Sequence, residues 1–455
     1  MHNAVVGTPR TGAATDVREA SPRDCIGVDV HRPGSANRAR RTVSMPNPAR
    51  AARGARRLLA LLCMMPATAF AQTAFSPFAA VSVEHDSNVF GFADREEAER
   101  IAGDPALSDT IRRASVGADL QHTFGQQTLR VGVQGGRNAF QHFSQLDHSH
   151  HRLGAALDWQ LGTRTDGLLD WRRERRLASL ADRQSDELTM ERERIATAAL
   201  NVDIGADWRL ENTARSRELA SPLVGLPGFT LEEDSLATEM RHNGLGLFNA
   251  GLRAEYLDGR FTGTPVGEEP FDQITVEAVA NYAASGLSRL NARLGHSRRR
   301  DRRNPDNDTS AVTGLVSLER TISGVTSADL ELFRQINSFS YGPESVIESG
   351  VRGSLRWQPT ARTGVQAGLE WSRNRFQDDR QSDRSDAPVR NDRQRSAFVR
   401  AQYAPLPWLS LHPYVHVRDR SSNYREQRYE KYVAGLEVRI RFGRAMPTEA
   451  ADRRY

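Results

Sequence analysis

Apolar and polar positions alternate with a period of two along most of this chain. The clearest case is Tyr432–Phe442, YVAGLEVRIRF, in which even positions such as Leu436 are apolar and odd positions such as Glu437 carry the charges. Successive side chains of a β-strand point to opposite faces of a sheet, so this pattern predicts a strand with one apolar and one polar face. About eighteen segments of roughly ten to fifteen residues show the same alternation.

The connections between these segments alternate in length. Short turns such as Gly125-Gln126 and Gly162-Thr163 are interleaved with longer polar stretches such as Ser87–Thr110, Gly263–Pro270 and Gln377–Arg390. Tight periplasmic turns opposite longer outer loops are typical of transmembrane β-barrels. We therefore expect an all-β fold over residues 72–442, a transmembrane antiparallel up-and-down β-barrel of about 18 strands, within a range of about 16–18.

Tryptophans support a membrane location for this barrel. Trp159, Trp208, Trp357 and Trp408 all lie within a few residues of a predicted short turn. Aromatic side chains form girdles at the interfaces of outer-membrane barrels, so these four predict a girdle at the inner interface. If Trp408 continued the strand that contains Leu409, its side chain would point to the polar face. Trp408 therefore also fits a position in the turn itself.

The segment before the barrel has the features of an export signal. Arginines from Arg50 to Arg57 precede the short apolar run Leu58–Met65, and small residues flank Phe70. We interpret residues 45–71 as a secretory signal peptide that is cleaved near Ala71. Residues 1–44 are then a non-native or disordered upstream extension, residues 443–455 form a short polar tail, and the mature chain is expected in the outer membrane of a Gram-negative bacterium.

Removing the signal segment changes the overall charge. Residues 1–71 hold 11 arginines and 4 acids, which leaves 51 basic and 53 acidic residues of the 62 and 57 in the whole chain. The sequence pI of about 9.5 therefore does not indicate a nucleic-acid partner. Both cysteines, Cys25 and Cys63, precede the cleavage site, as suits export to an oxidising compartment.

The polar face of the predicted barrel is rich in arginine. Arginine forks bind carboxylates in bidentate pairs, so an arginine-lined lumen could guide an acidic polysaccharide. The alternative is an internal ion-pair network with acids of neighbouring strands, and that interpretation covers most of these residues. The candidate lumenal binding residues are Arg172, Arg253, Arg289, Arg293, Arg352, Arg356, Arg400, Arg418, Arg439 and Arg441.

Motifs for catalysis or metal binding are weak. The stretch FQHFSQLDHSHH contains His142, His148, His150 and His151, but their spacing is not that of a known metal site, and we interpret it as a solvated polar loop. The sequence has no Gly-rich phosphate loop and no nucleophile elbow. We expect no enzymatic activity, no cofactor and no bound metal.

The first predicted strand ends in a polar step. In FSPFAAVSVEHDSNVFGF, the residues Asp86, Ser87, Asn88 and Val89 follow the strand. With the signal peptide and the long strands, this step resembles the EpsL-like family of exopolysaccharide-associated outer-membrane barrels and related porins. The resemblance implies export or assembly of an extracellular polysaccharide, and it makes Asp86 and Asn88 candidate binding residues at the rim.

Three functions remain open on the sequence. The first is a porin-like barrel that assists polysaccharide export, the second is a general diffusion porin for small solutes, and the third is a non-conducting surface or adhesion barrel. Expected partners are outer-membrane lipid and lipopolysaccharide, the outer-membrane insertion machinery, and a secreted polysaccharide with its periplasmic export components.

Overall fold

The computed structural model describes residues 73–183, 185–221, 228–264, 267–340, 342, 344–377 and 389–443. The predicted upstream extension, the signal peptide and all but the first residue of the predicted polar tail lie outside these residues. So does most of the predicted loop Gln377–Arg390.

The described residues form eighteen long strands and a few short helical turns. The strands are β1 (Thr73–Asp86), β2 (Asp109–Phe124), β3 (Gln127–Phe140), β4 (His148–Leu161), β5 (Thr165–Leu177), β6 (Met190–Ile204), β7 (Trp208–Ser221), β8 (Phe229–Leu245), β9 (Phe248–Thr264), β10 (Gly267–Ser285), β11 (Ser288–Asp301), β12 (Thr309–Ser323), β13 (Thr326–Ser338), β14 (Ser345–Thr360), β15 (Thr363–Gln377), β16 (Asn391–Leu406), β17 (Leu409–Ser422) and β18 (Tyr429–Arg441). The helical elements are α2 (Arg95–Ala102), α3 (Leu180–Arg183) and the 3-10 turns η2 (Ser144–Leu146), η3 (Pro305–Asn307) and η4 (Arg425–Gln427).

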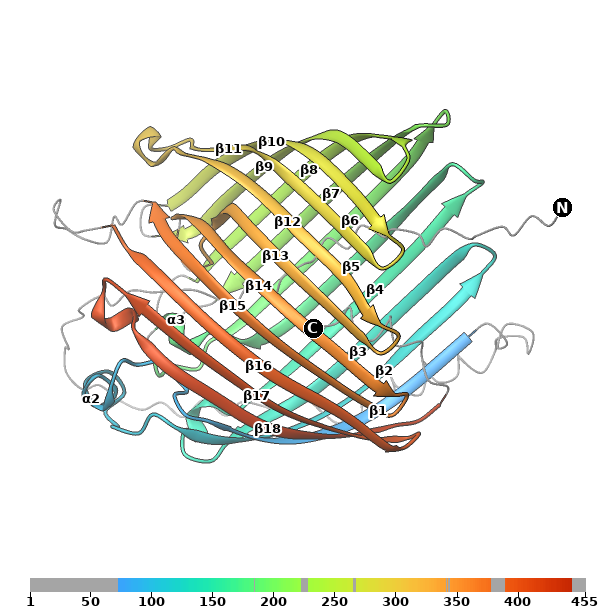
Figure 1. Ribbon diagram of the computed structural model, residues 1–455. Helices are drawn as coiled ribbons and strands as arrows, with labels where there is room; N and C mark the ends of the chain where they lie inside the picture. Colours follow the sequence, from blue (N-terminus) through green and yellow to red (C-terminus); the bar gives the residue numbers. More distant parts are fainter. Residues whose placement is uncertain are drawn as a thin grey trace, which may run out of the picture.

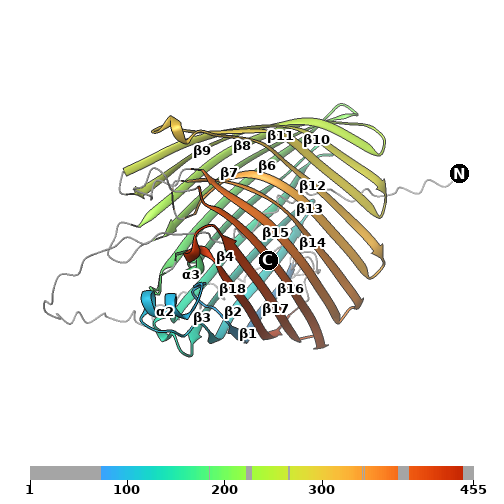
Figure 2. The same ribbon diagram turned by 60° about the vertical axis from the view of Figure 1, so that its left-hand side comes forward.

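The strands close into one antiparallel barrel. Each strand pairs with its neighbours in the chain, and β1 pairs with β18 from Phe78 opposite Arg441 to Asp86 opposite Val433. Figure 1 shows the tilted strands wrapping round this closed wall, and Figure 2 shows it from a second side. The predicted fold, an up-and-down barrel of about 18 strands, is confirmed.

The two faces of each strand follow the alternation in the sequence. In β18, Leu436 lies on the outside with 45% of its surface exposed, whereas Glu437 lies on the inner face opposite His412. Leu369 and Leu252, with 70% and 66% exposure, belong to the same outer apolar surface. A closed sheet with an apolar outer wall satisfies its backbone hydrogen bonds internally, which is the requirement for spanning a bilayer.

The two ends of the barrel differ in their connections. At one end the turns are tight, and Gly125 and Gly162 adopt positive φ angles of 59° and 63° there, which a residue with a side chain rarely adopts. At the other end lie α2, α3 and the longer connections, on the left in Figure 1. We take the end with the long connections as the extracellular end. No helix in the described part of the chain is long and apolar enough to cross a membrane.

One connection predicted to be long is not a loop. Strand β9 extends to Thr264 and β10 begins at Gly267, so the polar stretch Gly263–Pro270 is largely strand. Pro270 lies opposite Arg260 in this pair. The polar composition suggested a loop because the strands here extend to the rim, where apolar alternation is not required.

The tryptophans near the short turns take two positions. Trp159, Trp208 and Trp357 lie on outward positions of β4, β7 and β14 close to the tight-turn end, as the predicted girdle requires. Trp408 lies between β16 and β17 and so belongs to the turn.

A charge introduced on the outer wall should destabilise the barrel. Leu436 lies in the middle of β18, so Leu436→Arg should cost about 2–4 kcal/mol in the free energy of unfolding from lipid. The matched control is Val433→Arg on the same strand, which faces the lumen opposite His416 and should cost much less. Denaturant titration in lipid vesicles measures both. Equal costs would contradict the assignment of the two faces.

Candidate functional site

All ten predicted lumenal arginines occupy positions on the inner face of the barrel. The strand register shows this directly: Arg352 lies opposite Glu331 on one side and Glu370 on the other, while its neighbours in sequence share the outer face with Leu369. The same cross-strand relations place Arg172, Arg253, Arg289, Arg293, Arg356, Arg400, Arg418, Arg439 and Arg441 inside.

At least five of these arginines form ion pairs with acids of the barrel wall. The guanidinium of Arg352 donates to Glu331 at 2.6 Å, and that of Arg172 donates to Asp170 at 3.1 Å. The other three pairs are Arg253 with Glu255 and Glu277 at 2.6 and 3.2 Å, Arg289 with Glu319 at 3.3 Å, and Arg439 with Glu437 at 2.9 Å. For these five, the ion-pair alternative describes the observed contacts.

The other arginines are held differently. Arg400 donates from Nε and Nη2 to the amide oxygen of Gln366 at 2.9 and 2.6 Å. The guanidinium of Arg293 forms no hydrogen bond or ion pair with another described residue. Arg356, Arg418 and Arg441 complete the set on the inner face of β14, β17 and β18.

The wall of β5 to β8 carries a dense charge network. Glu193 accepts from Arg176 at 2.9 Å and from Arg217 at 2.8 Å, and Arg217 also reaches Glu233 at 3.1 Å. Arg209 is surrounded by three carboxylates, those of Asp166, Asp203 and Glu211, at 2.8 to 3.0 Å. The acids of this network were missing from the predicted site, although their alternate positions on the polar face were visible in the sequence.

The lumen is asymmetric in charge. On β16 to β18, six inward cations face two inward anions, whereas on β5 to β8 six cations face nine anions. The first set is Arg400, Arg418, Arg420, Lys431, Arg439 and Arg441 with Asp392 and Glu437. The second set is Arg172, Arg176, Arg209, Arg215, Arg217 and Arg241 with Asp166, Asp170, Glu174, Glu191, Glu193, Asp203, Glu211, Glu233 and Glu239. We call β16 to β18 the basic wall, and it lies almost opposite β5 to β8 in the ring of strands.

Three connections at the extracellular end pack together into a structured unit that we call the cap. It comprises the β1–β2, β3–β4 and β5–β6 connections, and Figure 2 shows α2 and α3 beside the ends of β17 and β18. Its apolar core consists of Val89, Phe90, Phe92, Ala98, Ile111, Phe140, Phe143, Leu146 and Leu180, of which Phe90, Phe92 and Leu146 are fully buried. Burial of this many apolar side chains gives the cap a core of its own.

The polar step after β1 organises the cap. Asn88 donates from Nδ2 to the carbonyl oxygens of Phe92 and Glu430 at 2.8 and 3.2 Å, and its Oδ1 accepts from the Phe92 N–H at 3.1 Å. Asp86 accepts from the Asn88 N–H at 3.0 Å and pairs with Lys431 at 2.7 Å. Both predicted rim residues are buried and engaged within the chain, and their predicted role in binding a ligand stays a prediction.

Helix α2 is fixed at its first turn. Asp94 accepts from the Glu97 N–H at 2.9 Å, and Glu97 reaches back to the Ala93 N–H at 2.7 Å, which is a reciprocal capping arrangement. The Glu97 N–H and the Arg425 guanidinium hold the pKa of the Asp94 carboxyl below its usual range. Arg425 lies 2.8 Å from Asp94, so the β17–β18 connection is linked to the β1–β2 connection.

Arg420 anchors α3 to the barrel. It lies on the inner face of β17 with 1% of its surface exposed, and it donates to Asp182 at 2.6 Å and to the Ala181 carbonyl at 2.8 Å. Its Nε donates to the Gln427 carbonyl at 2.7 Å, and its guanidinium lies 4.4 Å from the centre of the Tyr429 ring. Because β5 and β6 are several strands away from β17 in the ring, their connection spans part of the mouth.

The histidines predicted to form a polar loop do not converge. His142 lies 2.7 Å from Asp104, while His148 and His150 face inward and His151 faces outward. Among the residues described, no three His, Cys, Asp or Glu side chains lie together in a way that could hold a metal ion. The connection is instead organised by Asp109, which accepts from the backbone N–H groups of Gln141, His142 and Phe143 at 2.8 to 3.0 Å.

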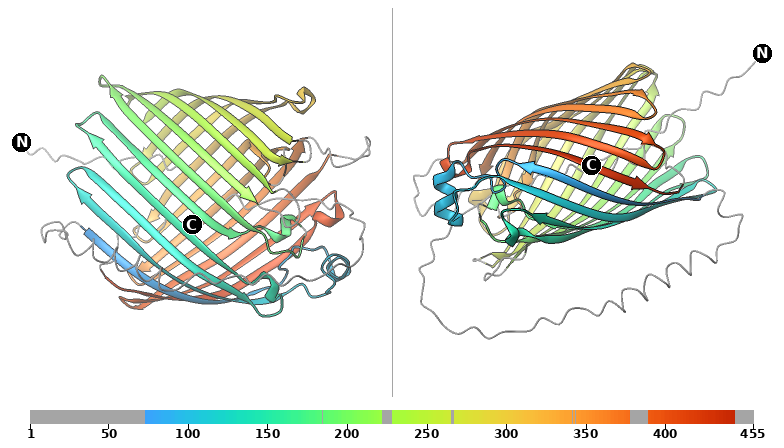
Figure 3. Two further views of the ribbon diagram at one scale, coloured as in Figure 1. Left: turned by 180° about the vertical axis from the view of Figure 1, so that it is seen from behind. Right: turned by 90° about the horizontal axis from the view of Figure 1, so that it is seen from below.

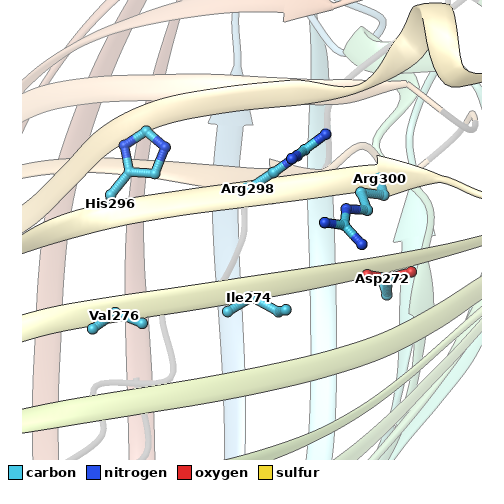
Figure 4. A pocket seen from close by; sticks show the side chains of 6 residues that line it. All are labelled: Asp272, Ile274, Val276, His296, Arg298 and Arg300. Carbon is cyan, nitrogen blue, oxygen red and sulfur yellow. The ribbon is translucent and has the colours of Figure 1, made fainter.

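The outer wall has a shallow depression between β10 and β11. It is lined by Asp272, Ile274 and Val276 on β10 and by His296, Arg298 and Arg300 on β11 (Figure 4). Acids flank its arginines: Arg298 pairs with Asp308 at 3.2 Å, and Arg300 lies opposite Asp272.

Comparison with known proteins yields structural likeness only. The sequence matches no protein-family profile and no curated protein. Solved structures of similar shape include OccK9 (OpdG) of Pseudomonas aeruginosa, at 12% identity and a TM-score of 0.43, covering 83% of this chain and 100% of that one. They also include OpdK of the same organism, solved with vanillate, at 10% identity and a TM-score of 0.41, covering 81% of this chain and 99% of that one. The siderophore receptor PirA of Pseudomonas aeruginosa has 9% identity and a TM-score of 0.40, covering 80% of this chain and 80% of that one. Because the sequence identities and TM-scores are this low, the ligands of those proteins are not evidence for what this chain binds.

Replacing Asn88 should loosen the cap without opening the barrel. Asn88→Ala leaves the Phe92 and Glu430 backbone groups without their partners in a buried site, which should cost about 1–3 kcal/mol locally. Hydrogen exchange of residues 88–92 should accelerate, whereas exchange in β1 and β18 should not change. The control is Gln126→Ala, whose side chain is exposed in the β2–β3 turn. Unchanged exchange in Asn88→Ala would contradict the organising role.

Proposed function

We propose that this protein is a porin-like outer-membrane channel of a Gram-negative bacterium that passes an anionic polymer, and that it assists the export or assembly of an extracellular polysaccharide. The closed barrel with its apolar outer wall and charged lumen supports the membrane channel. The polysaccharide, its periplasmic export components and the insertion machinery are part of the proposal.

The basic wall is the observation that carries this proposal. Its six inward cations are nearly opposite a wall on which acids outnumber bases, so the lumen has a transverse electric field. A strand of acidic sugars would follow the basic wall, and arginine forks would bind its carboxylates in bidentate pairs.

The cap supports a channel with a restricted mouth. The β5–β6 connection reaches Arg420 on the basic wall, and the β1–β2 connection packs on α3 at Gly91, where an added Cβ would lie 2.4 Å from the Ala181 Cβ. Passage of a polymer then requires this unit to shift. The core of the cap also includes Ile111 of β2 and Phe140 of β3, so a shift of the cap must loosen its packing on these strand ends.

Removing charge from the basic wall should lower anion selectivity. The combined variant Arg418→Gln, Arg439→Gln and Arg441→Gln removes half of its inward cations. The ratio of anion to cation permeability, measured from reversal potentials in planar bilayers, should fall several-fold because the local anion concentration follows the potential.

The matched control removes the same charge from the outer wall. Arg112, Arg137 and Arg334 are exposed on outward positions of β2, β3 and β13, and their replacement by Gln should leave selectivity unchanged. In a polysaccharide-producing host, the basic-wall variant should also reduce the secreted polymer. Full secretion after deletion of the whole gene would refute the export role, while a selective conductance would then favour a general diffusion porin.

Loss of the cap anchor should widen the mouth. Arg420→Ala leaves Asp182 buried without its partner, which destabilises the cap by about 3–5 kcal/mol. Single-channel conductance should rise, because α3 no longer stays on the basic wall. The control is Arg390→Ala, which removes a different buried ion pair at the same rim, that of Arg390 with Asp392 at the start of β16. An unaltered conductance in Arg420→Ala would show that the cap does not restrict the mouth.

A further inference from the structure

Two strands that precede long connections share a Trp-x-Arg-x-Arg pattern. On β5 it is Trp171, Arg173 and Arg175, and on β15 it is Trp371, Arg373 and Arg375. Both tryptophans face outward, with 38% and 41% exposure, and the apolar outer wall ends just above them. Tryptophan prefers the boundary between the apolar layer and the headgroups, so the arginines that follow lie at headgroup height.

The next strand adds two arginines to each set. On the outer face of β6, Arg194 lies directly opposite Arg173, and Arg192 lies opposite Arg175. On β16, Arg393 lies opposite Arg373, and Arg395 lies opposite Trp371. We call these two groups of four the arginine quartets.

The quartets face lipid, not the lumen. Arg173 and Arg175 share their face with the exposed Leu169, and Arg393 and Arg395 share theirs with Val399, which is 52% exposed. Seven of the eight arginines are exposed, and the eighth, Arg175, is half-buried. β15 and β16 lie on the near wall in Figure 1, while β5 and β6 lie on the opposite wall, which Figure 3 shows from behind.

Carboxylates of the described residues pair with few of these arginines. In the first quartet, Arg194 is the one arginine with an acid partner among the described residues, Glu218 at 2.9 Å. In the second, Arg373 donates to the amide oxygen of Asn391 at 3.0 Å, and Arg395 lies opposite Asp419 of β17. Within the described residues, no carboxylate forms an ion pair with any of the four.

Other outward arginines provide the contrast. At the depression in Figure 4, Arg298 pairs with Asp308, and beside it Arg302 pairs with Asp258 and with Asp272. Arg260 pairs with Glu232. The barrel therefore pairs Arg260, Arg298 and Arg302 with acids, whereas within the described residues Arg194 is the one quartet arginine that forms an ion pair.

Like charges directly opposite each other on neighbouring strands destabilise a sheet. The quartets place such pairs at headgroup height, where a phosphate would relieve the repulsion through bidentate, charge-assisted hydrogen bonds. We propose that each quartet is a binding site for a phosphorylated lipid of the outer leaflet, with the phosphate held by the guanidinium groups and an acyl chain lying on the apolar wall beneath Trp171 or Trp371. The site is independent of whatever passes through the lumen.

The ligand itself provides the first test. Full-length protein in detergent is titrated with bisphosphorylated lipid A, with the same lipid after removal of both phosphates, and with inorganic pyrophosphate, and bound species are counted by native mass spectrometry. Two bisphosphorylated lipids should bind, and loss of the phosphates should weaken binding at least about tenfold. This comparison uses the unaltered protein, so it does not depend on any variant folding.

Variants then assign the sites. Arg173→Gln with Arg175→Gln and Arg192→Gln should remove one bound lipid, and Arg373→Gln with Arg375→Gln and Arg393→Gln should remove the other. The control with the same change in charge is Arg260→Gln with Arg298→Gln and Arg302→Gln, whose arginines already have acid partners, and it should bind two lipids.

Three results would overturn the proposal. The first is equal binding of phosphorylated and dephosphorylated lipid. The second is pyrophosphate binding as tight as that of lipid A, which would identify a site for free phosphate. The third is a quartet variant that keeps both lipids but loses self-association, which would identify a second copy of the chain as the occupant.

Discussion

Closure of the sheet between β1 and β18 is the constraint on which the rest of this structure depends. A backbone group left unpaired in hydrocarbon costs several kcal/mol, so a strand edge cannot face lipid. The pairing of Phe78–Asp86 with Val433–Arg441 removes that edge. Once the ring is closed, the parity of each residue determines whether its side chain meets lipid or lumen, because a slip of one position would exchange the two faces of a whole strand.

The arginines illustrate how the surroundings of one residue type depend on the face of the strand that it occupies. Arg172 and Arg173 are neighbours in sequence, but the first lies inside beside Asp170 and the second lies outside opposite Arg194. The inner arginine is partly neutralised by its own wall. The outer one has no acid beside it, so the environment has to supply an anion. Local composition cannot distinguish the two, but the period-two pattern does.

The fold and the faces were predictable because both follow from short-range alternation. The ion-pair partners of the lumenal side chains were not predictable. Arg176 contacts Glu193 because of the register of β5 with β6, and that register depends on how the turns and the closed ring position each strand. The contact between Arg420 and Asp182 joins residues 238 positions apart, beyond any local pattern. The quartets have a signal in the sequence, the repeated Trp-x-Arg-x-Arg spacing, but the tryptophans near the short turns predict a girdle at the other interface only.

The contacts of the polar step after β1 show a structural role for it. Asn88 closes the turn to Phe92 and donates to the Glu430 carbonyl, and Asp86 pairs with Lys431. These contacts attach the cap to the barrel where β1 pairs with β18. A resemblance based on this step therefore concerns the architecture of the mouth. In the function that we propose, the cargo is selected at the basic wall, where six inward cations face two inward anions.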